Sequence, residues 1–306
     1  MKKFNEFLIE GVVRKQYPDK QRAKDLIDMS NRKQKNLNRT IEKIGIDDEN
    51  SNDIVEDCHD VILGLIRSKM LLNGFSASGQ GTHEAEVSFL EELNFTEQEV
   101  EFVNKLRYFR NGIFYYGKRF DKEYAKKALD FLDRFKEKIK PFLIIIRCPL
   151  GIGKTTIAKM LAEDFNAEYF SVDLILKQEG LDKIDEKEGC IPLGNFIQAN
   201  QKLLPKLKES LMLNRSVLID GNFYQKEQLE SLIKNIQEAK VCVFTLKAKL
   251  ATCIERDKKR KKGYGKEAAE AVYKLVSRLD YGTVINTENK TEKEILEEIK
   301  KEINIE

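Results

Sequence analysis

The spacing of apolar residues changes near Lys140–Pro141, and this change predicts two domains, 1–140 and 141–306. Before that point, apolar positions recur every three or four residues, as they do on the buried face of a helix. After it, short apolar runs alternate with helical stretches, as in a parallel sheet whose strands are joined by helices. The sequence therefore predicts an α-helical bundle followed by an α/β domain.

Four amphipathic helices are expected in the N-terminal half, and they predict an up-and-down bundle. Gly74 ends one of them, as glycine commonly does. Thr96 begins another, and Glu99, three residues later, completes a capping box. The polar stretch 74–81 is predicted to be a loop. The helices are expected at 20–44, 52–73, 96–117 and 122–139.

Five short apolar runs in the C-terminal half predict a mainly parallel, five-stranded sheet covered by helices on both faces. The first run, Phe142–Ile146, is apolar throughout, which is typical of a strand buried on both sides. Ligands of such sheets bind beyond the carboxyl ends of the strands, so functional residues are expected there. The strands are expected at 142–147, 168–172, 216–220, 241–246 and 283–286.

The segment CPLGIGKTT, which follows the first strand, matches the P-loop pattern G-x-x-x-x-G-K-[ST] at every position except the first. In this motif backbone N–H groups surround a polyphosphate, the lysine reaches its terminal oxygens and the hydroxyl binds Mg²⁺. Lys154 and Thr155 are the candidates for the last two roles. Cys148 replaces the first glycine at the strand end, where a small side chain is a plausible substitute because later amides hold the anion. The residues expected to bind ATP are Pro149, Leu150, Gly151, Ile152, Gly153, Lys154, Thr155 and Thr156.

Two aspartates follow later strands. Asp173 ends YFSVD and is a candidate base for an attacking hydroxyl, while an N-cap of the next helix is the alternative role. Asp220 ends the apolar run SVLID and is a candidate to hold Mg²⁺ together with Thr155. Its neighbour Gly221 is not the glutamate that motor-type ATPases use to activate water. This difference favours transfer to an acceptor over hydrolysis.

Basic residues form two groups of interest. Arg256 and Arg260 lie one helical turn apart after the fourth strand, and arginine donors suit the charge of a transferring phosphoryl group. A catalytic lid and a solvated basic face both remain open for this segment. The basic stretch 20–43 has no interleaved aromatic residues, so a solvated helix face is favoured there over nucleic-acid binding.

Composition limits the classes of protein that fit. No apolar run approaches the ~18 residues of a membrane-spanning helix, so no membrane partner is expected. Five scattered cysteines without a C-x-x-C pair fit reduced thiols and a cytoplasmic location. Charged residues make up 34% of the chain, but the net charge is only +3, which does not by itself indicate nucleic acid.

Residues 141–306 resemble the small P-loop kinases of the zeta-toxin, polynucleotide-kinase and gluconate-kinase group, labelled AAA_33. The stretches that carry the resemblance are PLGIGKTT, FSVD, SVLIDGNF, CIERDKKR and GTVINTENKTEKEILEEI. It implies an ATP- and Mg²⁺-dependent phosphotransferase in which Asp173 activates the acceptor and Arg256 and Arg260 belong to a lid. Leu176 stands where the group's S-x-D-x-x-R pattern has a substrate-binding arginine. The acceptor, a small metabolite or an RNA end, is therefore left open.

The first half resembles the HEPN family of helical bundles through NGFSASGQGTHEAEVSFLEEL and KLRYFRNGIFYYG. Members that cleave RNA carry R-x(4–6)-H at a dimer interface. Here Arg110 and Asn111 are present, but Tyr115 and Tyr116 stand where the histidine is expected, and a tyrosine, with a pKa near ~10, is a poor base at neutral pH. The resemblance implies a bundle that forms a homodimer or presents the substrate. An ATP-sensing module that binds or cleaves RNA is the alternative.

Overall fold

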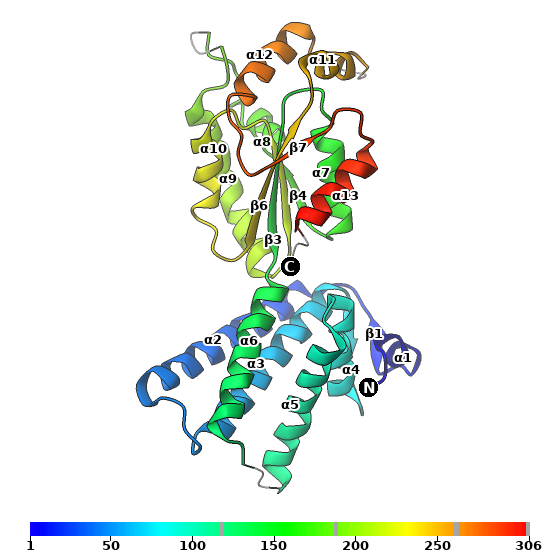
Figure 1. Ribbon diagram of the computed structural model, residues 1–306, viewed down its shortest axis with the longest axis vertical. Coiled ribbons are helices and arrows are strands. Elements are labelled where there is room, and N and C mark those ends of the chain that lie inside the picture. Colours follow the sequence, from blue (N-terminus) through cyan, green and yellow to red (C-terminus); the bar gives the residue numbers. More distant parts are fainter. Residues whose placement is uncertain (117–118, 187–188, 260–262, 304–306) are drawn as a thin grey trace. The chain divides into compact units, whose positions relative to one another are not determined.

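The computed structural model describes residues 1–116, 119–186, 189–259 and 263–303, and within the helix that ends at Tyr116 it describes side chains as far as residue 108. The chain divides into two compact units, Met1–Ile139 and Lys140–Glu306 (Figure 1). None of the helices in these described ranges has both the length and the apolar character needed to span a bilayer.

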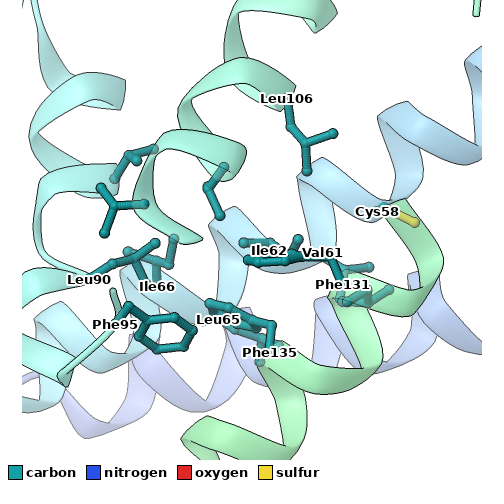
Figure 2. Close-up of a cluster of buried hydrophobic side chains, with 14 of the residues drawn as sticks. Cys58, Val61, Ile62, Leu65, Ile66, Leu90, Phe95, Leu106, Phe131 and Phe135 are labelled. Carbon is teal, nitrogen blue, oxygen red and sulfur yellow. The ribbon is translucent and has the colours of Figure 1, made fainter. Parts of the chain in front are cut away.

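The N-terminal unit is mainly helical, as the sequence predicts. Its central helix α3 packs against α2, α5 and α6, and it contributes buried residues along most of its length. Figure 2 shows part of this core, where Ile62 and Leu65 of α3 face Phe131 and Phe135 of α6. The elements of this unit are α1 Phe4–Ile9, β1 Val13–Lys15, α2 Lys20–Ile44, α3 Ser51–Leu72, β2 Phe75–Ala77, α4 Thr82–Ser88, the 3₁₀ helix η1 Glu91–Leu93, α5 Glu97–Tyr116 and α6 Lys122–Ile139.

The prediction of a loop over 74–81 is wrong for its first part. Strand β2 lies there and pairs with β1 in an antiparallel ribbon, with Ala77 opposite Val13. The ring of Phe75 packs against Phe4 and Phe89, at centroid distances of 5.3 and 6.1 Å. Because this strand is stabilised by partners far away in the chain, its three residues carry no local signal that distinguishes them from a loop.

The C-terminal unit contains the predicted five-stranded sheet, in the order β4-β5-β3-β6-β7 with every neighbouring pair parallel. Strand β3, the first of this unit, lies at the centre, so the loop that follows it is flanked by the carboxyl ends of β5 and β6. The elements are β3 Phe142–Arg147, α7 Lys154–Asp164, β4 Glu168–Ser171, α8 Val172–Gln178, α9 Leu193–Met212, β5 Val217–Gly221, α10 Lys226–Ile233, β6 Lys240–Lys247, α11 Leu250–Lys258, α12 Lys266–Val276, β7 Thr283–Asn286 and α13 Glu292–Ile303.

Two separate apolar cores cover the two faces of this sheet. Leu143 and Ile145 of β3 point into the core formed with α8, α9 and α10, whereas Ile144 and Ile146 point into the core formed with α7 and α13. Figure 1 shows α9 and α10 on one side of the strands and α7 and α13 on the other. Burial on both faces explains why β3 is apolar at every position but its last.

Candidate active site

The predicted P-loop connects β3, which ends at Arg147, to α7, which begins at Lys154. Gly151 and Gly153 have φ angles of +85° and +95°, a region that favours glycine. A Cβ atom at Gly151 would also lie 2.1 Å from the carbonyl oxygen of Cys253 in α11. Glycine is thus required at position 151 for two reasons, whereas at position 153 only the backbone angle requires it.

Cys148, which replaces the first glycine of the motif, is accommodated without strain. It is fully buried in the core that also contains Ile146 and Ile157, and it is not among the described residues with a positive φ. Burial raises the pKa of its thiol to about 12, although the positive charge of Lys154 acts in the opposite direction. The thiol is therefore neutral at physiological pH and adds no negative charge beside the loop.

Lys154 lies at the centre of a polar cluster at the carboxyl ends of the strands. Its ammonium is 2.5 Å from Asp173 Oδ2 and donates to Asn222 Oδ1 at 3.2 Å. The side chain is 7% exposed. Burial opposes the charge, but the carboxylates of Asp173 and Asp220 outweigh it and raise the pKa of Lys154. The ammonium is a buried permanent cation that can bind an anion.

Asp173 lies at the second position of the short helix α8, and Ser171 is the N-cap residue of that helix. The alternative role as an N-cap is therefore wrong. The carboxylate is instead directed to Lys154, and its Oδ1 accepts a weak hydrogen bond from the backbone N–H of Asn222 at 3.4 Å. With 36% of the side chain exposed, this carboxylate can also contact a second molecule.

Thr155 and Asp220 form a second polar pair in the cluster. The hydroxyl of Thr155 donates to Asp220 Oδ2 at 2.8 Å. Asp220 is fully buried, and its Oδ1 has no hydrogen-bond donor within the described ranges. Burial, together with the charge of Asp220, raises the pKa of the neighbouring Tyr169 to about 12.

This pair has the oxygen donors that Mg²⁺ prefers. Mg²⁺ is usually held by one or two protein oxygens plus phosphate and water, so a large acidic cluster is not needed. Consistent with that pattern, no group of three or more His, Cys, Asp or Glu residues suited to a metal ion occurs among the described residues. The hydroxyl of Thr155 and the buried oxygens of Asp220 therefore fit a Mg²⁺ ion that arrives with a nucleotide.

Two polar residues of this region were not predicted from the sequence. Asn222 forms hydrogen bonds with both Lys154 and Asp173. It directly follows the end of β5, and a polar residue at that position could have been identified from the sequence. Arg147 is the last residue of β3 and is fully buried. A charged residue in an otherwise apolar strand is a visible signal, but its purpose depends on partners distant in the sequence.

Of the two predicted lid residues, the structure describes only Arg256. Arg256 donates to the hydroxyl and the carbonyl of Thr287, after β7, at 3.5 and 3.3 Å. Arg260 lies outside the described residues. Leu176, which stands in place of a substrate-binding arginine, is buried in the apolar core, and the adjacent Lys177 is exposed.

The candidate HEPN residues Arg110, Asn111, Tyr115 and Tyr116 lie outside the described side chains. The two histidines of the chain are in other helices. His59 is buried in α3, with its Nδ1 3.4 Å from Asp60. His83 Nδ1 is 3.0 Å from Glu86 and 3.0 Å from Arg67, so it belongs to a small polar cluster between α3 and α4.

Comparisons with known proteins concern only part of the chain. Residues 143–278 match the family model AAA_33, which is described as an AAA domain. No curated protein matches the sequence. The match covers the P-loop, Asp173, Asp220 and Arg256, and it supports a nucleotide-dependent phosphotransferase.

Several solved structures are similar to about half of this chain. A sugar kinase from a Janibacter species has a TM-score of 0.45 and 14% identity, over 54% of this chain and 95% of that chain. A gluconokinase from Sinorhizobium meliloti has a TM-score of 0.38 and 12% identity, over 52% and 89%. A shikimate kinase from Acinetobacter baumannii, in complex with shikimate, has a TM-score of 0.38 and 20% identity, over 56% and 99%.

Proposed function

We propose that this protein is an ATP- and Mg²⁺-dependent phosphotransferase that acts on a hydroxyl acceptor. The observation that carries the proposal is the pairing of four residues at one edge of the sheet. Lys154 contacts Asp173 at 2.5 Å, and Thr155 contacts Asp220 at 2.8 Å. An anion-binding cation, a partly exposed carboxylate and a set of metal-binding oxygens therefore lie together beside a phosphate-binding loop.

The chemistry follows from these groups. The backbone N–H groups of residues 150–156 bind the phosphates, and Lys154 neutralises the oxygens on which negative charge increases during transfer. Mg²⁺, held by Thr155 and Asp220, supplies further neutralisation of the phosphates when bound. Asp173 accepts the proton of the acceptor hydroxyl as that oxygen bonds to the γ-phosphorus. The bond from phosphorus to the β–γ bridging oxygen breaks, and ADP leaves.

The contact between Lys154 and Asp173 also limits when the base is available. Without nucleotide, the ammonium holds the carboxylate at 2.5 Å, so the carboxylate is engaged by Lys154. Phosphate oxygens compete for the same ammonium. ATP binding therefore frees Asp173 for the acceptor, so the base acts only when the phosphoryl donor is present.

The N-terminal unit has a separate proposed role. On the resemblance of its sequence to HEPN bundles, we propose that it forms a homodimer or presents the acceptor. The proposed location of the protein is the cytoplasm, where ATP and Mg²⁺ are available.

The experiment that tests the function uses the full chain and ATP with a labelled γ-phosphate, offered to pooled metabolites and to RNA. We expect the wild type to label one acceptor class. Lys154→Ala is expected to reduce transfer on the order of 10²–10³-fold, because it removes a donor to the developing charge. Asp173→Asn is expected to bind ATP at least as tightly as the wild type, since Lys154 loses its competing carboxylate, and to fail in transfer.

Asp164→Asn is the matched control, because Asp164 ends α7 and pairs with Lys300 at 2.6 Å, apart from the cluster. It is expected to leave transfer unchanged. Absence of ATP binding by the wild type in calorimetry would end the phosphotransferase proposal. Normal transfer by Asp173→Asn would show that another group is the base.

A further inference from the structure

Arg147 is a fully buried arginine whose purpose the proposed reaction does not explain. It occupies the last position of the central strand β3, directly before the P-loop. Burial lowers the pKa of its guanidinium to about 10, although Cys148 and Asp280 act in the opposite direction. An apolar residue of similar volume would avoid the cost of desolvating the charge. The guanidinium must therefore have a use that an apolar side chain lacks.

The hydrogen bonds of the guanidinium to the described residues go to neutral oxygens, and three of the four acceptors are backbone carbonyls. Nε and Nη2 both donate to the carbonyl of Phe223, at 3.3 and 3.0 Å. Nη1 donates to Thr245 Oγ1 at 3.1 Å and to the carbonyl of Leu279 at 2.6 Å, and Nη2 donates to the carbonyl of Val276 at 2.9 Å. One side chain thus joins β3, β6, the loop after β5 and the end of α12.

The double hydrogen bond to Phe223 is the contact that concerns the active site. Phe223 has a φ angle of +36°, which is strained for a residue with a bulky side chain. Such a conformation persists only where its surroundings hold it in place. The preceding residue, Asn222, contacts both Lys154 and Asp173. The orientation of Asn222 therefore depends on the carbonyl that Arg147 holds.

The other hydrogen bonds of Arg147 fix the position of the guanidinium. Val276 is the last residue of α12, where helix carbonyls lack partners and carry partial negative charge. Leu279 follows shortly after that end. A guanidinium has enough donors, in a planar arrangement, to bind these carbonyls and Phe223 at once, and a lysine ammonium does not. The contacts explain why the residue is arginine.

We propose that Arg147 is a positioning residue of the phosphotransferase site: by holding the carbonyl of Phe223 against the end of α12, it orients Asn222 and, through the side chain of Asn222, Lys154. The inference rests on the proposed function, and it adds a residue that touches neither nucleotide nor acceptor. Its effect on the site is transmitted by one residue, Asn222, which precedes Phe223 in the chain. Loss of Arg147 and loss of Asn222 should therefore have the same consequence.

The test is a double-mutant cycle on Mg·ATP affinity and on transfer, with the variants Arg147→Lys, Asn222→Ala and the pair. Each single variant is expected to weaken ATP binding about 5-fold, the effect of one lost hydrogen bond, and to lower the transfer rate by more than it weakens ATP binding. In the Asn222→Ala background, Arg147→Lys is expected to change either quantity by no more than about 2-fold. Arg215→Lys, at the amino end of β5 where Arg215 pairs with Glu168 at 3.5 Å, is the control and should leave both quantities unchanged.

One further variant covers the case in which Arg147→Lys does not fold. Thr245→Val then replaces it, because this variant removes one acceptor of the Arg147 guanidinium with little change of shape. It should weaken ATP binding and transfer by less than Arg147→Lys, and neither quantity should change in the Asn222→Ala background. Effects that multiply in the double variant would show that Arg147 is merely structural and would overturn the inference. ATP binding without transfer by the wild type would overturn the phosphotransferase proposal alone, since the cycle on affinity still stands. Absence of ATP binding would overturn both.

Discussion

At the scale of single residues, burial and neighbouring charges together set the charge of Lys154 and Cys148. Lys154 and Cys148 are both buried near the P-loop, yet nearby carboxylates keep the first charged, whereas desolvation keeps the second neutral. The site thus combines a cation that attracts phosphate with a thiol that does not repel it. The replacement of glycine by cysteine is compatible with anion binding because the pKa of each group is raised, which leaves the lysine charged and the thiol neutral.

The P-loop glycines are predicted to differ in their tolerance of substitution. Gly151→Ala should destabilise the protein and weaken ATP binding, because its Cβ would overlap the backbone of Cys253 in addition to adopting an unfavourable φ. Gly153→Ala, whose Cβ has no atom within 4 Å, should cost only about 1–2 kcal/mol for the left-handed backbone. Thermal unfolding and calorimetry with Mg·ATP would measure both effects. Equal costs for the two variants would contradict the proposed role of the Cys253 contact.

Cys148→Gly is expected to lower the stability of the protein while leaving its affinity for Mg·ATP nearly unchanged. Removal of a fully buried side chain from the core should cost on the order of 1–2 kcal/mol of unfolding free energy. The affinity for Mg·ATP should change little, because Cys148 precedes the amides that bind phosphate. Chemical denaturation gives the first quantity and calorimetry the second. A large loss of affinity would show that the thiol itself contributes to the nucleotide site.

At the scale of elements, α11 contacts the P-loop and is linked to α12 by hydrogen bonds. Helix α11 approaches Gly151 through the backbone of Cys253, and its buried Asp257 accepts hydrogen bonds from the N–H groups of Tyr264 and Gly265, at 2.9 and 3.0 Å. These residues directly precede α12, whose far end is held by Arg147. Residues distant in the sequence thus place α11 and α12 at the carboxyl edge of the sheet.

Two helices, one in each unit, begin with the same capping box. In α5 the N–H of Glu99 donates to Thr96 Oγ1 at 3.3 Å and the N–H of Thr96 donates to Glu99 at 2.7 Å. In α13 Thr291 and Glu294 form the same two bonds at 3.3 and 2.7 Å. The equal geometry provides a matched pair of probes for the two units.

Thr96→Ala and Thr291→Ala are each expected to cost about 1 kcal/mol, the usual value of an N-cap. In a domain of this size that loss corresponds to a decrease in Tm of roughly 2–4 °C. If the two units unfold separately, calorimetry should show that each variant lowers a different transition. A shift of both transitions by either variant would show that the units unfold together.

At the scale of the whole molecule, each unit has its own core, so their functions can be tested separately. The central helix α3 organises the first core, and β3 divides the other two. Of the two histidines in the chain, His59 is buried among apolar residues and His83 is held by Glu86. Neither lies on α5, the helix that carries the HEPN-like motif.

We predict that the protein has no metal-independent ribonuclease activity, with or without ATP. Cleavage that leaves a 2′,3′-cyclic phosphate needs a group that exchanges protons near neutral pH, a role suited to histidine rather than to Tyr115 or Tyr116. Incubation of the purified chain with RNA and a chelator, followed by end-group analysis, checks this. RNA cleavage that Arg110→Ala abolishes would favour an ATP-sensing nuclease instead. A homodimer formed by the bundle, measured by light scattering, remains our prediction for these helices.

Local patterns in the sequence were sufficient for the architecture and for the phosphate-binding loop. The period of apolar residues depends on which faces of an element are buried, so it predicted the four long helices of the N-terminal unit and the five strands of the sheet, but not the short helices α1 and α4. The residues of a P-loop are consecutive, and their glycines, lysine and hydroxyl can be recognised without knowledge of the fold. The ribbon of β1 and β2 was missed because its pairing is not local.

The tertiary structure decided which polar residues meet. Lys154 contacts Asp173 and Asn222, which lie 19 and 68 positions away in the chain, and Arg147 reaches Phe223 and Leu279, which lie 76 and 132 positions away. No periodicity or spacing encodes such distances, because they depend on the order of the parallel strands. That order, β4-β5-β3-β6-β7, brings the ends of separate strands together. The sequence by itself determined the loop that can bind phosphate and the candidates Asp173, Thr155 and Asp220. Only the fold determined which of these side chains meet and added Asn222 and the buried Arg147.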